Sequence, residues 1–107
     1  MEGRKRIVVT GLGTINAIGG STAEFASSLK KGVCGIAPID LFETGGFHAA
    51  NGGQIRGFNS RRSIPPEFSL KRMSRADQLS FAATLEALAD AELWPIPALV
   101  KENTGVA

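Results

Sequence analysis

Cys34 is the only cysteine of the chain and His48 its only histidine, so they are the first residues to consider as a catalytic pair. A cysteine attacks as its thiolate, which is favoured by a neighbouring base or a helix N-terminus. Cys34 lies instead in residues 32–35, a stretch that is typical of a turn and offers neither feature. We expect no catalytic role for either residue. A single cysteine and a single histidine also disfavour a disulfide framework or a metal site.

Basic side chains gather in a second region. Residues 61–75 hold five of the twelve lysines and arginines against one acid, Glu67; the five are Arg61, Arg62, Lys71, Arg72 and Arg75. Such a cluster is either a solvated segment ahead of a helix or a docking surface for an acidic partner, where steering and charge-assisted hydrogen bonds favour association. The residues alone leave both interpretations open. Nucleic acid fits less well, because aromatic residues for stacking are limited to Phe58 and Phe68.

A third pattern is a glycine turn. Gly11-x-Gly13 follows an apolar run, as in the first part of a dinucleotide-binding fingerprint, where phosphate approaches a helix N-terminus. However, Asn16 occupies the place of the third glycine, and the next helix signal starts only after Gly20. We therefore interpret the glycines as a tight strand exit with φ above zero.

The elements that would position these groups begin with a strand. Residues 7–9 are a continuous apolar, β-branched run, which is typical of a strand buried on both faces of a parallel sheet. Ser21 and Glu24 form a capping-box pattern and predict a helix that ends at residues 30–32, where two lysines also suit the helix dipole.

Residues 33–59 are rich in loops, with a short strand predicted over residues 54–58. Ser74 and Asp77 predict the start of the longest helix, which stops before Trp94-Pro95. Its apolar stripe comprises positions 79, 82, 85, 88 and 89. Residues 104–107 resemble the first half of another buried strand. The predicted order is strand, helix, loops, helix and half strand.

Composition places the chain among ordinary globular proteins. Its 107 residues are 43% hydrophobic and 21% charged, with a net charge of +2. The basic tip Arg4-Lys5-Arg6 precedes an apolar run as in a signal peptide, but glycines and polar residues such as Asn16 interrupt that run. No window approaches the roughly 18 consecutive apolar residues of a membrane span. We expect a cytoplasmic protein that contacts neither membrane nor nucleic acid.

Ordered landmarks run along the whole chain. They are residues 7–13, Gly19, Leu29 with Gly32, Gly35-Ile36, residues 39–42, Gly53-x-Ile55-x-x-Phe58, Arg72-Met73 and residues 87–91. No single landmark is decisive, whereas the ordered set is specific. In this order and spacing the chain resembles the N-terminal stretch of β-ketoacyl-[acyl-carrier-protein] synthases of the elongating type, similar to synthase II.

The resemblance implies an α/β protein with a thiolase-like fold. Residues 1–107 would be the first part of its N-terminal half, truncated within a strand. The family's members are cytosolic, homodimeric acyltransferases of fatty acid or polyketide synthesis, which join acyl and malonyl groups on acyl carrier protein by decarboxylative Claisen condensation. The resemblance implies no metal or organic cofactor.

The family's catalytic cysteine and two histidines would lie beyond Ala107, and Cys34 matches a position where relatives commonly have serine. We therefore predict no catalytic residue in this chain. Alone, it should be inactive, expose apolar surface and be marginally folded or molten.

One partner contact carries over from the resemblance. In bacterial relatives, basic residues just before the methionine matched by Met73 contact the acidic helix of acyl carrier protein, and Lys71 and Arg72 match that place. Phe68 departs from a further basic position upstream, which weakens the patch, and Ala17 replaces a proline often found before the matched Gly19. The departures bear on affinity for the partner rather than on the family.

A second functional class stays open. A noncatalytic relative, such as a chain-length-factor-like subunit, or a truncated pseudogene product would begin in the same way. The sequence downstream separates these classes, because an intact cysteine followed by two histidines supports the enzyme and their replacement supports the subunit.

Overall fold

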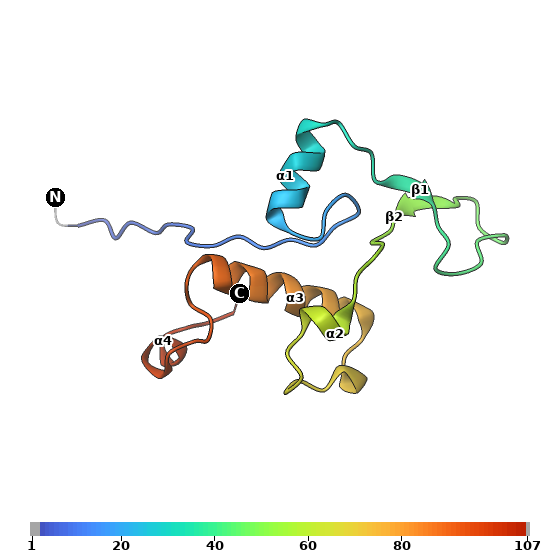
Figure 1. The fold of residues 1–107 in the computed structure, drawn as a ribbon. Coiled ribbons are helices and arrows are strands. Elements are labelled where there is room, and N and C mark those ends of the chain that lie inside the picture. The colour runs from blue at the N-terminus through green and yellow to red at the C-terminus, as the bar shows by residue number, and fades with distance from the viewer. Residues whose placement is uncertain (1–2, 107) are drawn as a thin grey trace.

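A computed structural model describes residues 3–106, which form an elongated arrangement (Figure 1). The Cα radius of gyration is 17.6 Å, whereas a compact domain of this length has about 13 Å. The elements follow in the order α1 (Thr22–Lys30), β1 (Ile36–Pro38), β2 (Asn51–Gly53), α2 (Ser60–Ser63), the 3₁₀ turn η1 (Leu70–Arg72), α3 (Arg75–Asp90) and α4 (Ala98–Glu102).

Helix α1 confirms the first helix prediction. The hydroxyl of Ser21 accepts a hydrogen bond from the Glu24 backbone N–H at 3.2 Å. The Glu24 carboxylate accepts from the N–H of Gly20 at 2.7 Å, one residue earlier than in a regular capping box. The helix ends at Lys30, and Gly32 follows with φ of 68°, a conformation that glycine adopts without steric cost.

Helix α3 carries the predicted capping box. The Ser74 hydroxyl accepts from the Asp77 N–H at 3.1 Å, and the Asp77 carboxylate accepts from the Ser74 N–H at 2.9 Å. Ala82 is buried on the predicted apolar stripe, whereas Ala89 is exposed. The helix ends at Asp90, and the short helix α4 that follows was not predicted.

The prediction of a strand over residues 7–9 is wrong for the described chain. These residues belong to a segment that projects away from α1 and α3 (Figure 1), and the side chains of Ile7 and Val9 are 96% and 78% exposed. A strand exists through hydrogen bonds with a neighbour, and no segment within residues 3–106 pairs with this one. Residues 104–106 likewise form no strand, and Ala107 lies outside the described residues.

The strand predicted over residues 54–58 is also wrong. β1 and β2 form a short antiparallel hairpin in which Ile36 faces Gly53, and pairing ends there. The next residue, Gln54, turns its side chain inward instead. Its amide donates to the Asp40 carboxylate at 2.6 Å and accepts from the Asp40 N–H at 3.0 Å, which closes the loop between the strands.

The core is small. Ile64 and Ala82 are the only buried apolar side chains among the side chains whose placement the structure describes. Large apolar side chains from several elements remain more than half exposed, including Leu29, Ile36, Phe42 and Phe47. The predicted exposure of apolar surface is confirmed.

Candidate functional site

The 3₁₀ turn η1 presents Lys71 and Arg72, and both residues are exposed. The turn is held by α3, because the Gln78 amide donates to the carbonyl oxygens of Leu70 at 3.4 Å and Met73 at 3.3 Å. The backbone that carries the two cations is therefore fixed against the start of the longest helix.

Helix α2 presents two further cations, Arg61 and Arg62, which are also exposed. Asn59 caps this single turn, since its side-chain oxygen accepts from the backbone N–H groups of Arg61 at 3.1 Å and Arg62 at 3.3 Å. Helix α2 contacts α3, so two short turns are anchored on one helix (Figure 1).

An apolar layer lies between α2 and η1. Ile64 is only 3% exposed, and the ring centroid of Phe68 lies 4.6 Å from that of Phe81 on α3. Phe68 therefore serves packing at the place where the resemblance expects a surface cation. A cavity of about 460 Å³ opens beside this layer, and its lining includes Arg61 and Lys71.

The charges of this surface are not neutralised by the described residues. The described residues form one ion pair, which joins Arg56 to Asp40 with 3.6 Å between nitrogen and oxygen. The Arg75 guanidinium donates to the carbonyl oxygen of Ile55 at 3.0 Å. By contrast, the side chains of Arg61, Arg62, Lys71 and Arg72 have no acidic partner within residues 3–106. The arrangement provides four unpaired cations, which suits an acidic macromolecule.

The expectation that Cys34 and His48 are not a catalytic pair stays a prediction. Both residues are exposed, and the Cys34 thiol donates only a long hydrogen bond of 4.0 Å to the carbonyl oxygen of Ile36. The described residues contain no cluster of three or more potential metal ligands. Across the same part of the chain, every helix is too short or too polar to cross a membrane.

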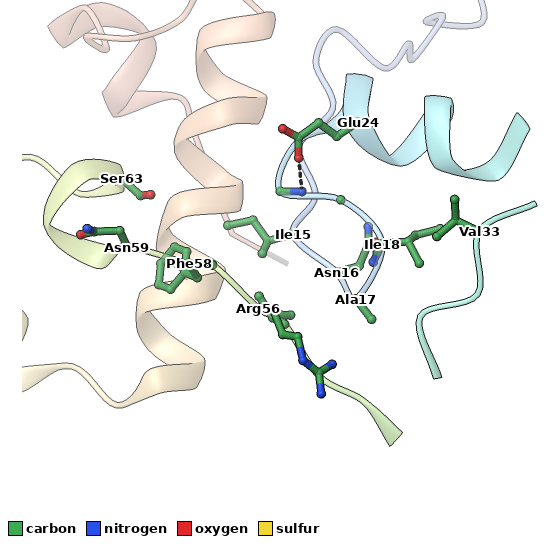
Figure 2. A pocket seen from close by; sticks show the side chains of 14 residues that line it. Ile15, Asn16, Ala17, Ile18, Glu24, Val33, Arg56, Phe58, Asn59 and Ser63 are labelled. Carbon is green, nitrogen blue, oxygen red and sulfur yellow. Dashed lines mark hydrogen bonds between the residues drawn. The ribbon is translucent and has the colours of Figure 1, made fainter. Parts of the chain in front are cut away.

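Figure 2 shows a cavity of about 490 Å³ between the loop of residues 15–20 and residues 55–59. Several of its polar side chains are engaged within the protein, whereas Ser63 of the lining is exposed. Glu24 accepts from Gly20, Arg56 is paired with Asp40, and Asn59 caps α2. Among the described residues of this lining, no hydrogen bond joins the Ser63 hydroxyl to the Glu24 carboxylate.

Residues 11–14, called the glycine segment below, lie close against α3. This contact gives a different reason for the glycines from the one expected from the sequence. A Cβ on Gly13 would overlap the carbonyl oxygen of Ala83 and lie 2.7 Å from the amide nitrogen of Ala87. A Cβ on Gly11 would overlap the Ala87 carbonyl oxygen. Neither glycine has a positive φ, so the expected left-handed turn is wrong and helix proximity explains these residues instead.

Two carboxylates that the sequence analysis overlooked fix this segment. Asp90 accepts from the Leu12 N–H at 2.9 Å, and Glu86 accepts from the N–H groups of Thr14 at 2.9 Å and Thr22 at 2.7 Å. The amides that would face a phosphate thus face carboxylates, which agrees with the rejection of dinucleotide binding. In the sequence, the signal for this contact was the pair of acids Glu86 and Asp90, which lie four residues apart on the predicted helix and next to alanines that leave room for another segment.

Comparisons with known proteins agree with these observations. The family model described as Beta-ketoacyl synthase, N-terminal domain, matches residues 4–107. The chain is 33% identical over 90 residues to 3-oxoacyl-[acyl-carrier-protein] synthase 2 of Synechocystis sp., covering 84% of the chain and 21% of that protein. It is 32% identical over 104 residues to the synthase 2 of Staphylococcus aureus strain COL, covering 97% of the chain and 24% of that protein.

A solved structure is similar as well. The structure titled "The ishigamide ketosynthase/chain length factor" matches with a TM-score of 0.78 and 36% identity, over 85% of this chain and 22% of that one. The chain thus spans between a fifth and a quarter of the length of these relatives.

Proposed function

The chain belongs to the β-ketoacyl synthase family, and from this premise we propose that it is the N-terminal part of a longer elongating synthase that extends acyl chains in fatty acid or polyketide synthesis. Its α/β structure is a partial thiolase-like fold, as the structural match indicates. The longer protein, called the complete synthase below, would be a cytoplasmic homodimer.

The proposed reaction has two covalent stages. A cysteine thiolate of the complete synthase attacks an acyl thioester on a carrier protein, which forms an acyl-enzyme and releases the carrier thiol. Malonyl-carrier protein then loses carbon dioxide with the help of two histidines, and its carbanion attacks the acyl-enzyme. A carbon–carbon bond forms and the cysteine thiolate leaves, while backbone N–H groups stabilise the oxyanion.

We assign the catalytic groups to the protein beyond Ala107. This assignment is supported by the exposed positions of Cys34 and His48, which form no hydrogen bond with each other. Residues 1–107 would then be inactive alone, and their role in catalysis would be to support the sheet and to bind the carrier protein.

The observation that carries the partner proposal is the set of unpaired cations on α2 and η1. Lys71 and Arg72 form its centre, and we assign them to the binding of an acidic acyl carrier protein. Charges of this kind mainly raise the association rate and suppress wrong partners, and their effect falls with ionic strength.

The test is charge reversal in the complete synthase. Lys71→Glu with Arg72→Glu should weaken carrier-protein binding about tenfold or more at low salt, with the circular dichroism spectrum unchanged. Lys30→Glu with Lys31→Glu is the matched control, because it makes the same change in net charge at exposed residues of another element. Equal affinities for the two double variants would refute the docking assignment.

A second candidate is a noncatalytic chain-length-factor-like subunit. It is favoured by the similarity to a structure whose title names both a ketosynthase and a chain length factor. The residues downstream of Ala107 decide between the two, since only the enzyme needs the cysteine and both histidines. Acyl transfer to the complete protein, followed by mass spectrometry, gives the same decision chemically.

A further inference from the structure

Asn51, on β2, has a less restrained side chain than Asn16 or Asn59. The Asn16 amide donates to the Thr14 hydroxyl at 3.1 Å and accepts from the Ile18 N–H at 3.0 Å. Asn59 accepts from two backbone N–H groups as the cap of α2. By contrast, the side chain of Asn51 is exposed and has no hydrogen-bond partner within residues 3–106. Its amide is therefore free to turn toward the backbone.

The residue that follows Asn51 is Gly52, whereas a residue with a side chain follows Asn16 and Asn59. In an asparagine–glycine pair, the backbone nitrogen of the glycine can attack the side-chain carbonyl carbon of the asparagine and close a five-membered ring. A Cβ on the second residue crowds this approach, and glycine has none. Asn51 and Gly52 therefore have the residue types that this cyclisation needs.

The closed hairpin of β1 and β2 blocks the attack. The Ile39 N–H donates to the Ala50 carbonyl oxygen at 2.8 Å, and Ala37 faces Gly52 two positions further along the same ladder. Hydrogen-bonded pairs alternate with non-bonded pairs in an antiparallel ladder, so Ala37 and Gly52 are also a hydrogen-bonded pair. The Gly52 N–H is therefore engaged while the strands are paired.

The hairpin can open locally, because little holds it closed. Its strands pair over three residue pairs, and it lies at one end of the molecule, apart from α3 (Figure 1). Side chains restrain it through Gln54, which donates to the Asp40 carboxylate at 2.6 Å, and Arg56, which donates to the Pro38 carbonyl oxygen at 2.8 Å. A two-stranded hairpin is only marginally stable in water, and such a segment opens more often than a core does.

We propose that Asn51 is a deamidation site whose rate is set by the opening of this hairpin. The Gly52 nitrogen forms a bond with the side-chain carbonyl carbon of Asn51, and the bond from that carbon to the NH₂ group breaks. Ammonia leaves with the proton of the Gly52 N–H, and a cyclic imide remains. Water then opens the ring at either carbonyl carbon, which gives aspartate, or isoaspartate with its backbone running through the side-chain carbon. Water is the co-reactant, and nothing is oxidised or reduced.

Either product changes β2. Asn51 faces Pro38, whose carbonyl oxygen accepts from Arg56, so a new carboxylate there would compete with Asp40 for the guanidinium. Isoaspartate also adds a carbon to the backbone, which breaks the register of so short a strand. The modified hairpin would therefore not close as before. This inference goes beyond the proposed carrier-protein docking and does not depend on it.

The experiment incubates the complete synthase at mildly alkaline pH and follows each asparagine by peptide mass spectrometry, since replacement of NH₂ by OH raises the peptide mass. Asn51 should be modified at least about tenfold faster than Asn59. Gly52→Ala should slow the reaction at Asn51 at least about fivefold, because the added Cβ crowds the attack. Gly45→Ala, in the loop of the same hairpin, is the matched control, since a Cβ there meets no atom within 4 Å.

Gln54→Ala tests the dependence on hairpin opening. Loss of its bonds with Asp40 should speed the modification of Asn51 by about twofold to tenfold, which is the change in opening that a lost hydrogen bond produces. Gln78→Ala is the control, because that amide bonds the backbone of η1 instead. If Gln54→Ala does not fold, Asp40→Ala removes the same side-chain bond from its exposed partner. A rate at Asn51 no higher than at Asn59, or one that these hairpin variants leave unchanged, would overturn the proposal.

Discussion

The carboxylate of Glu86 accepts a hydrogen bond from the backbone N–H of Thr14 at 2.9 Å, although 72 residues of sequence separate them. Its second oxygen accepts from the N–H of Thr22, the first residue of α1, at 2.7 Å. One side chain of α3 therefore fastens both the glycine segment and the start of α1. Asp90 repeats the arrangement one helical turn later, at Leu12.

Glu86→Gln tests the importance of this double contact. Glutamine keeps one acceptor oxygen but directs an NH₂ group at a backbone N–H, so one of the two donors loses its partner. The free energy of unfolding of the complete synthase should fall by about 1–3 kcal/mol, measured by urea denaturation. Glu67→Gln, at an exposed residue, should change it by less than about 0.5 kcal/mol. Coincident unfolding curves for the two variants would contradict the prediction.

Gly13→Ala tests the close approach of the glycine segment to α3. The added methyl group would overlap the backbone of Ala83, which cannot move aside as a flexible side chain can. We expect destabilisation at or above the upper end of the roughly 1–3 kcal/mol that overpacking costs, with loss of condensing activity. Gly45→Ala is the control, because a Cβ there meets no atom within 4 Å. Normal stability of Gly13→Ala would show that the contact is loose.

Local signals accounted for the helices α1 and α3. The caps at Ser21 and Ser74 act over three residues, so the sequence reveals them directly. The hairpin was missed because the side chain of Gln54 bonds Asp40, which lies 14 residues away and which no local pattern identifies. The strand at residues 7–9 has the right composition, but pairing depends on a neighbour that residues 3–106 do not supply.

The candidate site, too, could be predicted from the sequence only in part. Charge clustering in the sequence marked five cations, Arg61 among them, and the family resemblance singled out Lys71 and Arg72. The position of Arg61 beside the cavity could not be predicted, since it depends on the folding of α2 and η1 against α3 and on the packing of Phe68 against Phe81. The glycine contacts likewise depend on a helix about 70 residues further along the chain.

Acid should weaken the cap of α3. Hydrogen bonds from the backbone N–H and the hydroxyl of Ser74 lower the pKa of Asp77 below its usual value. A carboxyl whose pKa is lower in the folded state stabilises the fold above its unfolded pKa, about 3.9, and this contribution disappears as pH falls through the folded pKa. Asp77→Asn should therefore reduce the loss of stability of the complete synthase below about pH 4.

Asp40 provides a second, independent test of how acid lowers the stability of the protein. The Gln54 amide, and then the charge of Arg56, lower the pKa of Asp40. Asp40→Asn should therefore also flatten the acid limb of the stability curve, and the double variant should flatten it further because the two carboxylates share no hydrogen-bond partner. Urea midpoints recorded from pH 6 to pH 2.5 give the comparison. Curves for both variants that run parallel to the unmodified protein would contradict the prediction.

A charged substitution in the exposed run at residues 7–9 should be tolerated in the 107-residue chain and should destabilise the complete synthase. In the 107-residue chain Val8 is 64% exposed, so Val8→Lys should leave its structure unchanged and reduce binding of the dye ANS. In the complete synthase we expect the same residue to be buried in a sheet, where an unpaired lysine should cost several kcal/mol or prevent folding. The unmodified 107-residue chain should also melt broadly. A sharp, cooperative melt of that chain as a monomer, or equal tolerance of Val8→Lys in both proteins, would show that residues 7–9 need no sheet to cover them.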